Sequence, residues 1–178
     1  MKIINTNFKG LKLIKHKKFK DKRGYLKIIY NKKIIKPYHF VHEYCTNSKK
    51  NSLRGFHFQY KYLQAKYVSV LKGKILDCVI DLRKGSKTFL KVYKTILSDK
   101  NNKALFIPCG FAHAYYSLGS ENIIYYKVTN YYKPNFEDGI NPLDKKLKIN
   151  WPGKKFNISS KDKKLGNLEN FLKKFKYL

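Results

Sequence analysis

The sequence predicts an all-β protein, an antiparallel sandwich or barrel that ends in a short helical segment. Two observations carry this prediction. Short apolar runs recur along the 178-residue chain, separated by clusters of Gly, Pro, Asn and Ser. Within these runs apolar and polar residues alternate, which is typical of strands, and no long helical pattern precedes the C-terminus. The length suits one domain over residues 1–178, and no repeat or linker divides the chain.

The individual strands are expected where apolar runs end at turn residues. They are predicted over 54–59, 67–71, 74–82, 88–97, 104–107, 112–118 and 122–129. The dipeptide Lys72-Gly73 joins two of these runs and predicts a tight hairpin. Near the end, the apolar spacing predicts one helix face, made of Leu165, Leu168, Phe171, Leu172 and Phe175.

Two of the predicted strands have an unusual half-polar face. In the 74–82 run, one face is wholly apolar, whereas the other places Asp77 among apolar residues. Such a face predicts a polar cavity inside a barrel, with an exposed surface as the alternative. The 54–59 run is similar, because His57 and Gln59 share one face and two phenylalanines share the other.

Composition limits the classes of function. The net charge of +29 comes from lysines scattered over the whole chain, so we expect salt-sensitive, non-specific contact with polyanions and no specific nucleic-acid function. No apolar run approaches the roughly 18 residues of a membrane span, and the start lacks the apolar core of a signal peptide. Cys45, Cys78 and Cys109 are odd in number and have no CxxC spacing, so neither a disulfide framework nor a structural zinc site is expected. This favours a reducing cytoplasm.

Several kinds of catalytic site lack their sequence signals. A metal site is not predicted, because His57 and His113 are the only histidines of the strand-rich middle and the segment "HFQ" around His57 lacks a close second His. There is no G-x-S-x-G elbow, P-loop or G-x-G-x-x-G, and Cys109 fits a structural role. Acid–base chemistry remains, with His57 as base, a tyrosine of the pairs Tyr125-Tyr126 or Tyr131-Tyr132 as acid, and Lys66 facing an oxyanion. Ordinary packing is the alternative for each of these residues.

Arginine is rare in this chain, which makes each one informative. Only Arg23, Arg54 and Arg83 occur among 40 Lys and Arg residues. The planar guanidinium grips phosphate or carboxylate with two parallel hydrogen bonds, which lysine cannot do. A geometric role is therefore expected for the arginines, with a buried ion pair to Asp81 as the alternative for Arg83.

Six segments in order resemble the dTDP-4-dehydrorhamnose 3,5-epimerase family. They are "FKDKRGYLKI", "LRGFHFQ", "QAKYVSVLKGKILDCVIDLRKGSKTF", "LFIPCGFAHAYYSL", "YYKVTNYYKPNFEDGI" and "INWP", and they span about residues 19 to 165. The resemblance implies a cupin-type jelly roll and a homodimer without metal or other cofactor. It also implies epimerisation of a nucleotide-diphospho-4-keto-6-deoxy sugar at C3, C5 or both, in cell-surface polysaccharide biosynthesis.

The resemblance assigns a role to each catalytic candidate. His57 is the base that removes the proton beside the C4 ketone, and Asp162 orients its imidazole. Lys66 stabilises the developing O4 anion. Tyr126 returns a proton from the opposite face of the ring, which inverts the centre.

Binding roles follow from the same resemblance. Arg23 and Arg54 match arginines that hold the diphosphate. Further substrate contacts are expected from Gln59, Asp77, His113, Tyr132, Glu137 and Lys161. Strict alternation places Arg54 and His57 on opposite strand faces, so either Gly55 allows a bulge or Arg54 reaches round from the start of the strand.

Three segments depart from the family pattern. Ile28 replaces a usual Glu, His42-Glu43-Tyr44 replaces a "QDN"-like segment, and residues 141–144 replace a Trp-Asn-Asp-like segment. His42 and Tyr44 are therefore expected at the substrate with altered contacts. This leaves open a GDP- or CDP-linked hexose or heptose, and inversion at C3 alone. The sequence also leaves open a ketoisomerase of the same fold and a non-catalytic binding module.

Overall fold

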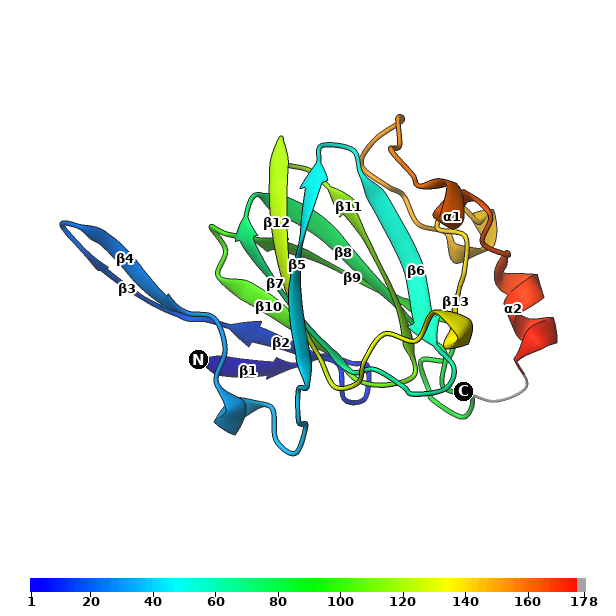
Figure 1. Cartoon of the computed structure of the whole chain (residues 1–178), viewed down its shortest axis with the longest axis horizontal. Helices are drawn as coiled ribbons and strands as arrows, with labels where there is room; N and C mark the ends of the chain where they lie inside the picture. Colours follow the sequence, from blue (N-terminus) through cyan, green and yellow to red (C-terminus); the bar gives the residue numbers. More distant parts are fainter. Residues whose placement is uncertain (176–178) are drawn as a thin grey trace.

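The computed structural model describes residues 1–175, and β-strands dominate it (Figure 1). Two antiparallel sheets enclose a common interior. The six-stranded sheet has, in spatial order, β1 (Lys2–Asn5), β2 (Lys12–Lys15), β10 (Lys103–Ile107), β7 (Lys66–Lys72), β12 (Glu121–Val128) and β5 (His42–Lys49). The five-stranded sheet has β13 (Glu137–Gly139), β6 (Leu53–Gln59), β11 (Phe111–Ser117), β8 (Lys74–Asp81) and β9 (Val92–Ser98). The predicted all-β sandwich is confirmed.

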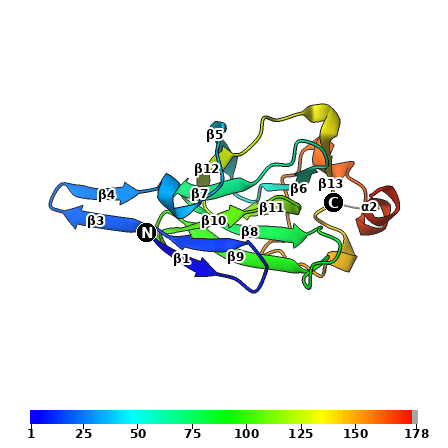
Figure 2. The ribbon, with the colours of Figure 1, turned by 90° about the horizontal axis from the view of Figure 1, so that it is seen from below.

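A two-stranded hairpin stands apart from both sheets. It consists of β3 (Lys17–Asp21) and β4 (Gly24–Ile28), and we call it the arm. Figures 1 and 2 show the arm projecting from one end of the molecule, with the C-terminal segment at the other end. The helical elements are η1 (Lys32–Ile34), η2 (Pro134–Phe136), η3 (Lys145–Leu147), α1 (Ser160–Lys163) and α2 (Leu168–Lys174).

Most predicted strands are present with small shifts of their ends. The strand predicted over 88–97 begins at Val92, because backbone hydrogen bonds from Phe89 to Ser86 and from Lys91 to Thr88 form turns instead. The strands before residue 53 were not predicted from the sequence. β1 and β3 are short and mostly exposed, and β3 is rich in lysine, so their apolar alternation is weak.

The predicted hairpin at Lys72-Gly73 is wrong. β7 pairs with β10 and β12, whereas β8 pairs with β11 and β9, so the chain passes here from one sheet to the other. Gly73 has φ = +88°, and a Cβ there would lie 2.3 Å from the backbone oxygen of Glu121. A Lys-Gly pair marks a tight turn, but the partners of the flanking strands are set by distant residues.

Three apolar clusters pack against the two sheets. The first fills the interior between the sheets, and Val68 and Val79 represent its two walls. The second lies between the five-stranded sheet and the C-terminal segment. The third covers the outer face of the six-stranded sheet under residues 30–40. Both faces of β8 are thus buried, and its half-polar face points into the interior as predicted, with Asp77 fully buried.

The predicted C-terminal helix is α2. Phe171 is buried, and Leu168 and Phe175 are packed against the second cluster. Two residues of the predicted apolar face differ from expectation. Leu165 precedes the helix, and Leu172 is 44% exposed because it lies one position, about 100°, round from Phe171.

Candidate active site

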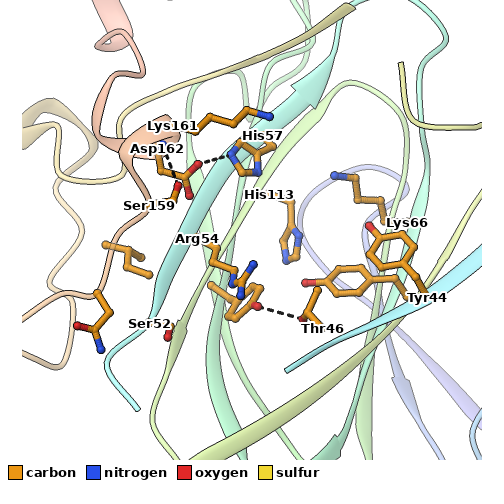
Figure 3. A pocket seen from close by; sticks show the side chains of 14 residues that line it. Tyr44, Thr46, Ser52, Arg54, His57, Lys66, His113, Ser159, Lys161 and Asp162 are labelled. Atoms are coloured by element: carbon orange, nitrogen blue, oxygen red, sulfur yellow. Dashed lines mark hydrogen bonds and ion pairs between the residues drawn. The ribbon is translucent and has the colours of Figure 1, made fainter. Parts of the chain in front are cut away.

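A cavity of about 380 Å³ lies between the two sheets. Its wall includes eight of the predicted site residues: Tyr44, Arg54, His57, Lys66, His113, Tyr126, Lys161 and Asp162 (Figure 3). His57 belongs to β6 of the five-stranded sheet, and Tyr126 belongs to β12 of the six-stranded sheet. A ligand in this cavity therefore has an imidazole and a phenol on walls that come from different sheets.

A β-bulge in β6 brings Arg54 and His57 to the same face of the strand. His57 lies opposite His113 of β11 and Arg54 lies opposite Tyr115, so three steps along β6 match two along β11. Gly55 has φ = +105°, and a Cβ there would lie 2.4 Å from the backbone oxygen of His113. Glycine is therefore required at this position. Of the two arrangements that the sequence allowed, the bulge is the correct one.

Asp162 of α1 fixes the imidazole of His57. One carboxylate oxygen accepts a hydrogen bond from His57 Nε2 at 2.8 Å, and the other accepts from the Gly55 backbone N–H at 3.1 Å. The carboxylate is buried, which acts to raise the pKa of Asp162. The hydrogen bonds from His57 and Gly55, with that of Ser159, outweigh burial and hold the pKa below its ordinary value.

This arrangement decides which ring nitrogen of a neutral His57 carries the lone pair. When Nε2 donates its proton to Asp162, the lone pair lies on Nδ1. No residue within 1–175 makes a hydrogen bond to Nδ1, and the ring lies at the cavity wall (Figure 3). His57 can therefore accept a proton from a bound molecule.

The Tyr126 phenol is held by aromatic contacts on two sides. Its ring stacks on Tyr44 with centroids 4.9 Å apart and an interplanar angle of 13°. It meets the ring of His113 edge-on, at 6.1 Å and 65°. Burial, with the nearby Tyr115 and Tyr44, raises the pKa of Tyr126 well above its ordinary value. Tyr126 is thus a neutral phenol that can donate a proton into the cavity.

A second His–Asp pair and a lysine form the inner part of the site. His113 Nε2 lies 2.8 Å from Asp77 Oδ2, and both side chains are buried. Burial raises the pKa of Asp77 despite His113 and Lys66 nearby, and burial lowers the pKa of Lys66 despite the carboxylates of Glu137 and Asp77. The Lys66 side chain makes no hydrogen bond to residues 1–175, so its ammonium group is available to a ligand oxygen. Asp77 lies behind His113 rather than at the cavity wall.

The rim of the cavity is polar and aromatic. Lys161 forms an ion pair with Glu137, and Tyr132 donates to the same carboxylate at 2.9 Å. Lys161 also donates to the Tyr132 hydroxyl at 3.2 Å. His42 lies beside Tyr44, with ring centroids 5.8 Å apart. Four of the predicted binding residues thus contact a residue of the cavity wall or belong to it, and of these four only Lys161 lines the cavity.

Arg54 and Gln59 lie on the same strand but differ in role. Arg54 donates from Nε to Ser48 Oγ at 3.1 Å and lines the cavity, so with Lys66 and Lys161 it makes the wall strongly cationic. Gln59 does not line this cavity. Its amide donates to the carbonyl of Tyr62 at 2.7 Å and to that of Tyr131, and it accepts from the Lys133 N–H at 2.7 Å. Gln59 thus anchors two loops, and its contact with a substrate stays a prediction.

Arg23 does not reach the cavity of its own chain. It lies at the turn of the arm, where its side chain is 85% exposed and pairs with Asp21 at 2.7 Å. Figure 1 shows the arm pointing away from the sheets. The structure therefore does not bring Arg23 to the cavity of its own chain, and its contact with a diphosphate stays a prediction.

Several lining residues were not predicted from the sequence. They are Thr46, Ser52, Leu53, Tyr115, Asn157 and Ser159. Ser159 did have a signal, because Ser-x-x-Asp is a helix-start pattern and Ser159 accepts the Asp162 N–H at 3.1 Å. Thr46 shares a strand face with Tyr44 and follows from alternation once β5 is known.

Two kinds of feature are absent from the described part of the chain. Between residues 1 and 175, no three His, Cys, Asp or Glu side chains gather in a way that would hold a metal ion. Within the same residues, no helix has the length and apolarity needed to cross a membrane.

Comparison with known proteins decides the family. The dTDP-4-dehydrorhamnose 3,5-epimerase family matches residues 5–170. The chain belongs to this family. A curated dTDP-4-dehydrorhamnose 3,5-epimerase from Methanothermobacter thermautotrophicus is 37% identical over 155 residues, which cover 85% of this chain and 84% of the relative. The predicted family, and with it the class of isomerases that epimerise sugars, is confirmed.

Solved structures of the family superpose closely on this fold. The dTDP-6-deoxy-D-glucose-3,5-epimerase of Legionella pneumophila, in complex with dTDP-4-keto-L-rhamnose, has a TM-score of 0.91 at 38% identity, over 94% of this chain and 93% of that one. A 3'-monoepimerase of Streptomyces bikiniensis, in complex with dTDP-quinovose, has a TM-score of 0.89 at 25% identity, over 94% and 88%. The predicted cupin-type architecture of the family is confirmed.

Proposed function

We propose that this family member is a dTDP-4-dehydrorhamnose 3,5-epimerase, which inverts C3 and C5 of a dTDP-linked 4-keto-6-deoxy sugar. One observation carries the proposal. The cavity has a base, His57 with Asp162, on one sheet and a neutral phenol, Tyr126, on the other. Inversion of a carbon centre requires a proton to leave from one side and another to arrive from the opposite side.

The chemistry follows from the ketone at C4 of the sugar. The ketone acidifies the C–H bonds at C3 and C5, because loss of either proton gives an enolate. His57 Nδ1 takes the proton, and Asp162 stabilises the resulting imidazolium. The Lys66 ammonium group stabilises the negative charge on O4. Tyr126 then donates its phenolic proton to the opposite face of the carbon, and exchange with solvent restores His57 and Tyr126.

The charge of the cavity suits a sugar joined to a nucleoside diphosphate. Arg54, Lys66 and Lys161 line one cavity, and Arg54 offers the planar donor set that grips phosphate. The relatives are named for dTDP-sugars, which supports dTDP over GDP or CDP. We infer a single domain over residues 1–178, of which 176–178 lie outside the described residues. We also infer that the enzyme works in the cytoplasm and serves cell-surface polysaccharide synthesis. The lack of metal and cofactor stays a prediction.

A homodimer gives the arm a role. The arm exposes large apolar side chains at its surface, namely Phe19, Tyr25 and Leu26 at 47%, 57% and 63%. Such residues are expected to be covered by a partner, and most oligomers of soluble proteins are symmetric dimers. In this arrangement the arm of one subunit reaches the other, and Arg23 binds the diphosphate in the cavity of the partner.

Substrate and stereochemistry are tested together in deuterated water. The protein is incubated with dTDP-, GDP- and CDP-linked 4-keto-6-deoxyhexoses, and deuterium at C3 and C5 is followed by NMR. We expect label at both centres with the dTDP-sugar. Label at C3 alone would instead support a 3'-monoepimerase like that of Streptomyces bikiniensis. No label with any of the sugars would exclude the proposed activity.

The dimer is tested by mixing Arg23→Ala, which binds substrate weakly, with His57→Asn, which lacks the base, after unfolding and refolding them together. If the arm acts across the dimer, hybrid dimers contain one cavity with both residues intact, and activity at low substrate concentration exceeds the average of the two variants. If Arg23 acts within its own chain or not at all, the mixture shows only the average of the two variants.

A further inference from the structure

Tyr44 covers the open side of Tyr126. It lies directly opposite Tyr126 in the ladder between β5 and β12, and the two rings stack nearly parallel at 4.9 Å. β5 is the last strand of its sheet and pairs only with β12 within residues 1–175. Tyr44 itself is 38% exposed, so the stacked pair forms the outer layer of the cavity wall.

The position of the Tyr126 phenol depends on packing rather than on hydrogen bonds. Within residues 1–175, its hydroxyl makes no hydrogen bond to another residue. On the inner side, the ring meets the edge of His113, which Asp77 holds at 2.8 Å. On the outer side, the Tyr126 ring stacks on the face of the Tyr44 ring. Without Tyr44, the Tyr126 ring would gain freedom toward the open side.

We propose that Tyr44 is a positioning residue, which holds Tyr126 at the angle needed to protonate the sugar on the face opposite His57. This inference rests on the proposed epimerase mechanism. Parallel aromatic rings at this distance attract each other beyond the burial of their area. Tyr44 thereby determines how often the enolate carbon is protonated on the opposite face, which inverts the centre, rather than on its original face.

The two halves of the reaction should respond differently to loss of Tyr44. Proton removal depends on His57 and Asp162, which lie on the other sheet and on α1. Proton return from the opposite face depends on Tyr126. The ratio of inversion to deuterium uptake therefore isolates Tyr44, because a change in substrate binding alters both quantities together.

The test compares Tyr44→Val with Tyr44→Phe in deuterated water, using the dTDP-linked 4-keto-6-deoxyhexose. Valine suits an edge strand but removes the ring, whereas phenylalanine keeps the ring and removes only the hydroxyl. We expect Tyr44→Val to lower the ratio of inversion to deuterium uptake about two- to tenfold. We expect Tyr44→Phe to keep the ratio of the unsubstituted protein. Cys45→Val, at the next position of the same strand but exposed and outside the cavity, is the matched control and should also keep that ratio.

Each outcome decides the matter. An unchanged ratio in Tyr44→Val overturns the positioning role, and so does a ratio in Tyr44→Phe as low as in Tyr44→Val. Thermal unfolding shows whether the variants fold. If Tyr44→Val does not fold, Tyr44→Leu is used in its place. Tyr126→Phe separates the two levels of the argument. If it inverts the sugar normally, the proposed mechanism is wrong; if it does not while Tyr44→Val does, only the role of Tyr44 is wrong.

Discussion

The cavity and the arm hold their functional candidates in opposite ways. In the cavity, His57 is bonded to the buried Asp162, which is itself held by the backbone of Gly55. On the arm, the ion-pair partner of Arg23 within residues 1–175 is Asp21, and both side chains are half or more exposed, so water and salt screen this pair. Buried contacts within one chain therefore hold the cavity residues in place. At the end of the arm, by contrast, the ion pair of Arg23 is exposed to solvent.

The root of the arm is much better fixed than its end. His16 precedes β3 and Ile29 follows β4, so they mark the two points where the arm leaves the body. The buried Tyr67 joins them, since its hydroxyl donates to the Ile29 carbonyl at 2.6 Å and lies 2.7 Å from His16 Nε2. A firm root with an exposed end suits a segment that contacts a second molecule. Substitutions in the cavity, at the root and at the end of the arm can break or sharpen this contrast.

The largest effect is expected at the cavity base. His57→Asn should lower the rate of deuterium uptake at C3 and C5 by about a thousandfold, because the ring nitrogen that removes the proton is gone. His39→Asn is a suitable control, since His39 is exposed and lies outside the cavity. A His57→Asn variant that retained most of its activity would show that another group is the base.

Two glycines with positive φ compare the cavity and the arm directly. A Cβ on Gly55 would meet backbone at 2.4 Å, whereas one on Gly24, at the turn of the arm, meets nothing within 4 Å. Gly55→Ala should cost more than about 3 kcal/mol of unfolding free energy, and Gly24→Ala about 1–2 kcal/mol from backbone strain alone. Urea unfolding measures both. Equal losses would mean that the bulge is not under the constraint described.

The root of the arm should make stability depend on pH. Burial, with the charges of Lys27 and the N-terminus, lowers the pKa of His16 from 6.5 to about 4. Between these values the unfolded chain binds a proton that the folded chain does not, so stability falls as pH falls from 6.5 to about 4. The loss should amount to roughly 3 kcal/mol. His16→Gln should remove this part of the dependence in urea unfolding at several pH values, and an unchanged dependence would contradict it.

The smallest effect is expected at the end of the arm. Arg23→Ala should raise KM for the dTDP-sugar about tenfold with little change in kcat, because a charged hydrogen bond to phosphate is lost while the base and acid remain. Lys22→Ala removes the same charge from the neighbouring position and should change KM much less. Equal effects of the two variants would reduce the role of Arg23 to general electrostatics.

Alternation and rarity in the sequence already indicated part of this site. Period-two patterns placed His57 and Asp77 on faces that turn to the interior, and the scarcity of arginine drew attention to Arg54. Asp162 had no such local signal, since it lies 105 residues from His57 and was assigned only through resemblance to the family. Tyr126 was one of several tyrosines until the family blocks singled it out.

The features that the sequence could not predict have a common physical cause. The strand partners at Lys72-Gly73, the loop contacts of Gln59 and the direction of the arm that carries Arg23 all depend on which distant segments meet. Gly73 forms the same kind of tight turn whether the strands pair with each other or enter different sheets. Gln59 contacts a loop that is distant in the sequence, and the direction of the arm that carries Arg23 cannot be predicted from a local sequence pattern.

The central claim is that a base and an acid on opposite sheets invert the sugar. The most direct test is Tyr126→Phe in deuterated water, with configuration and label at C3 and C5 read by NMR from the same sample. We predict deuterium in recovered sugar whose configuration is retained at a centre served by Tyr126, because His57 still removes and returns a proton on its own side. Deuterium accompanied by normal inversion at both centres would contradict the account.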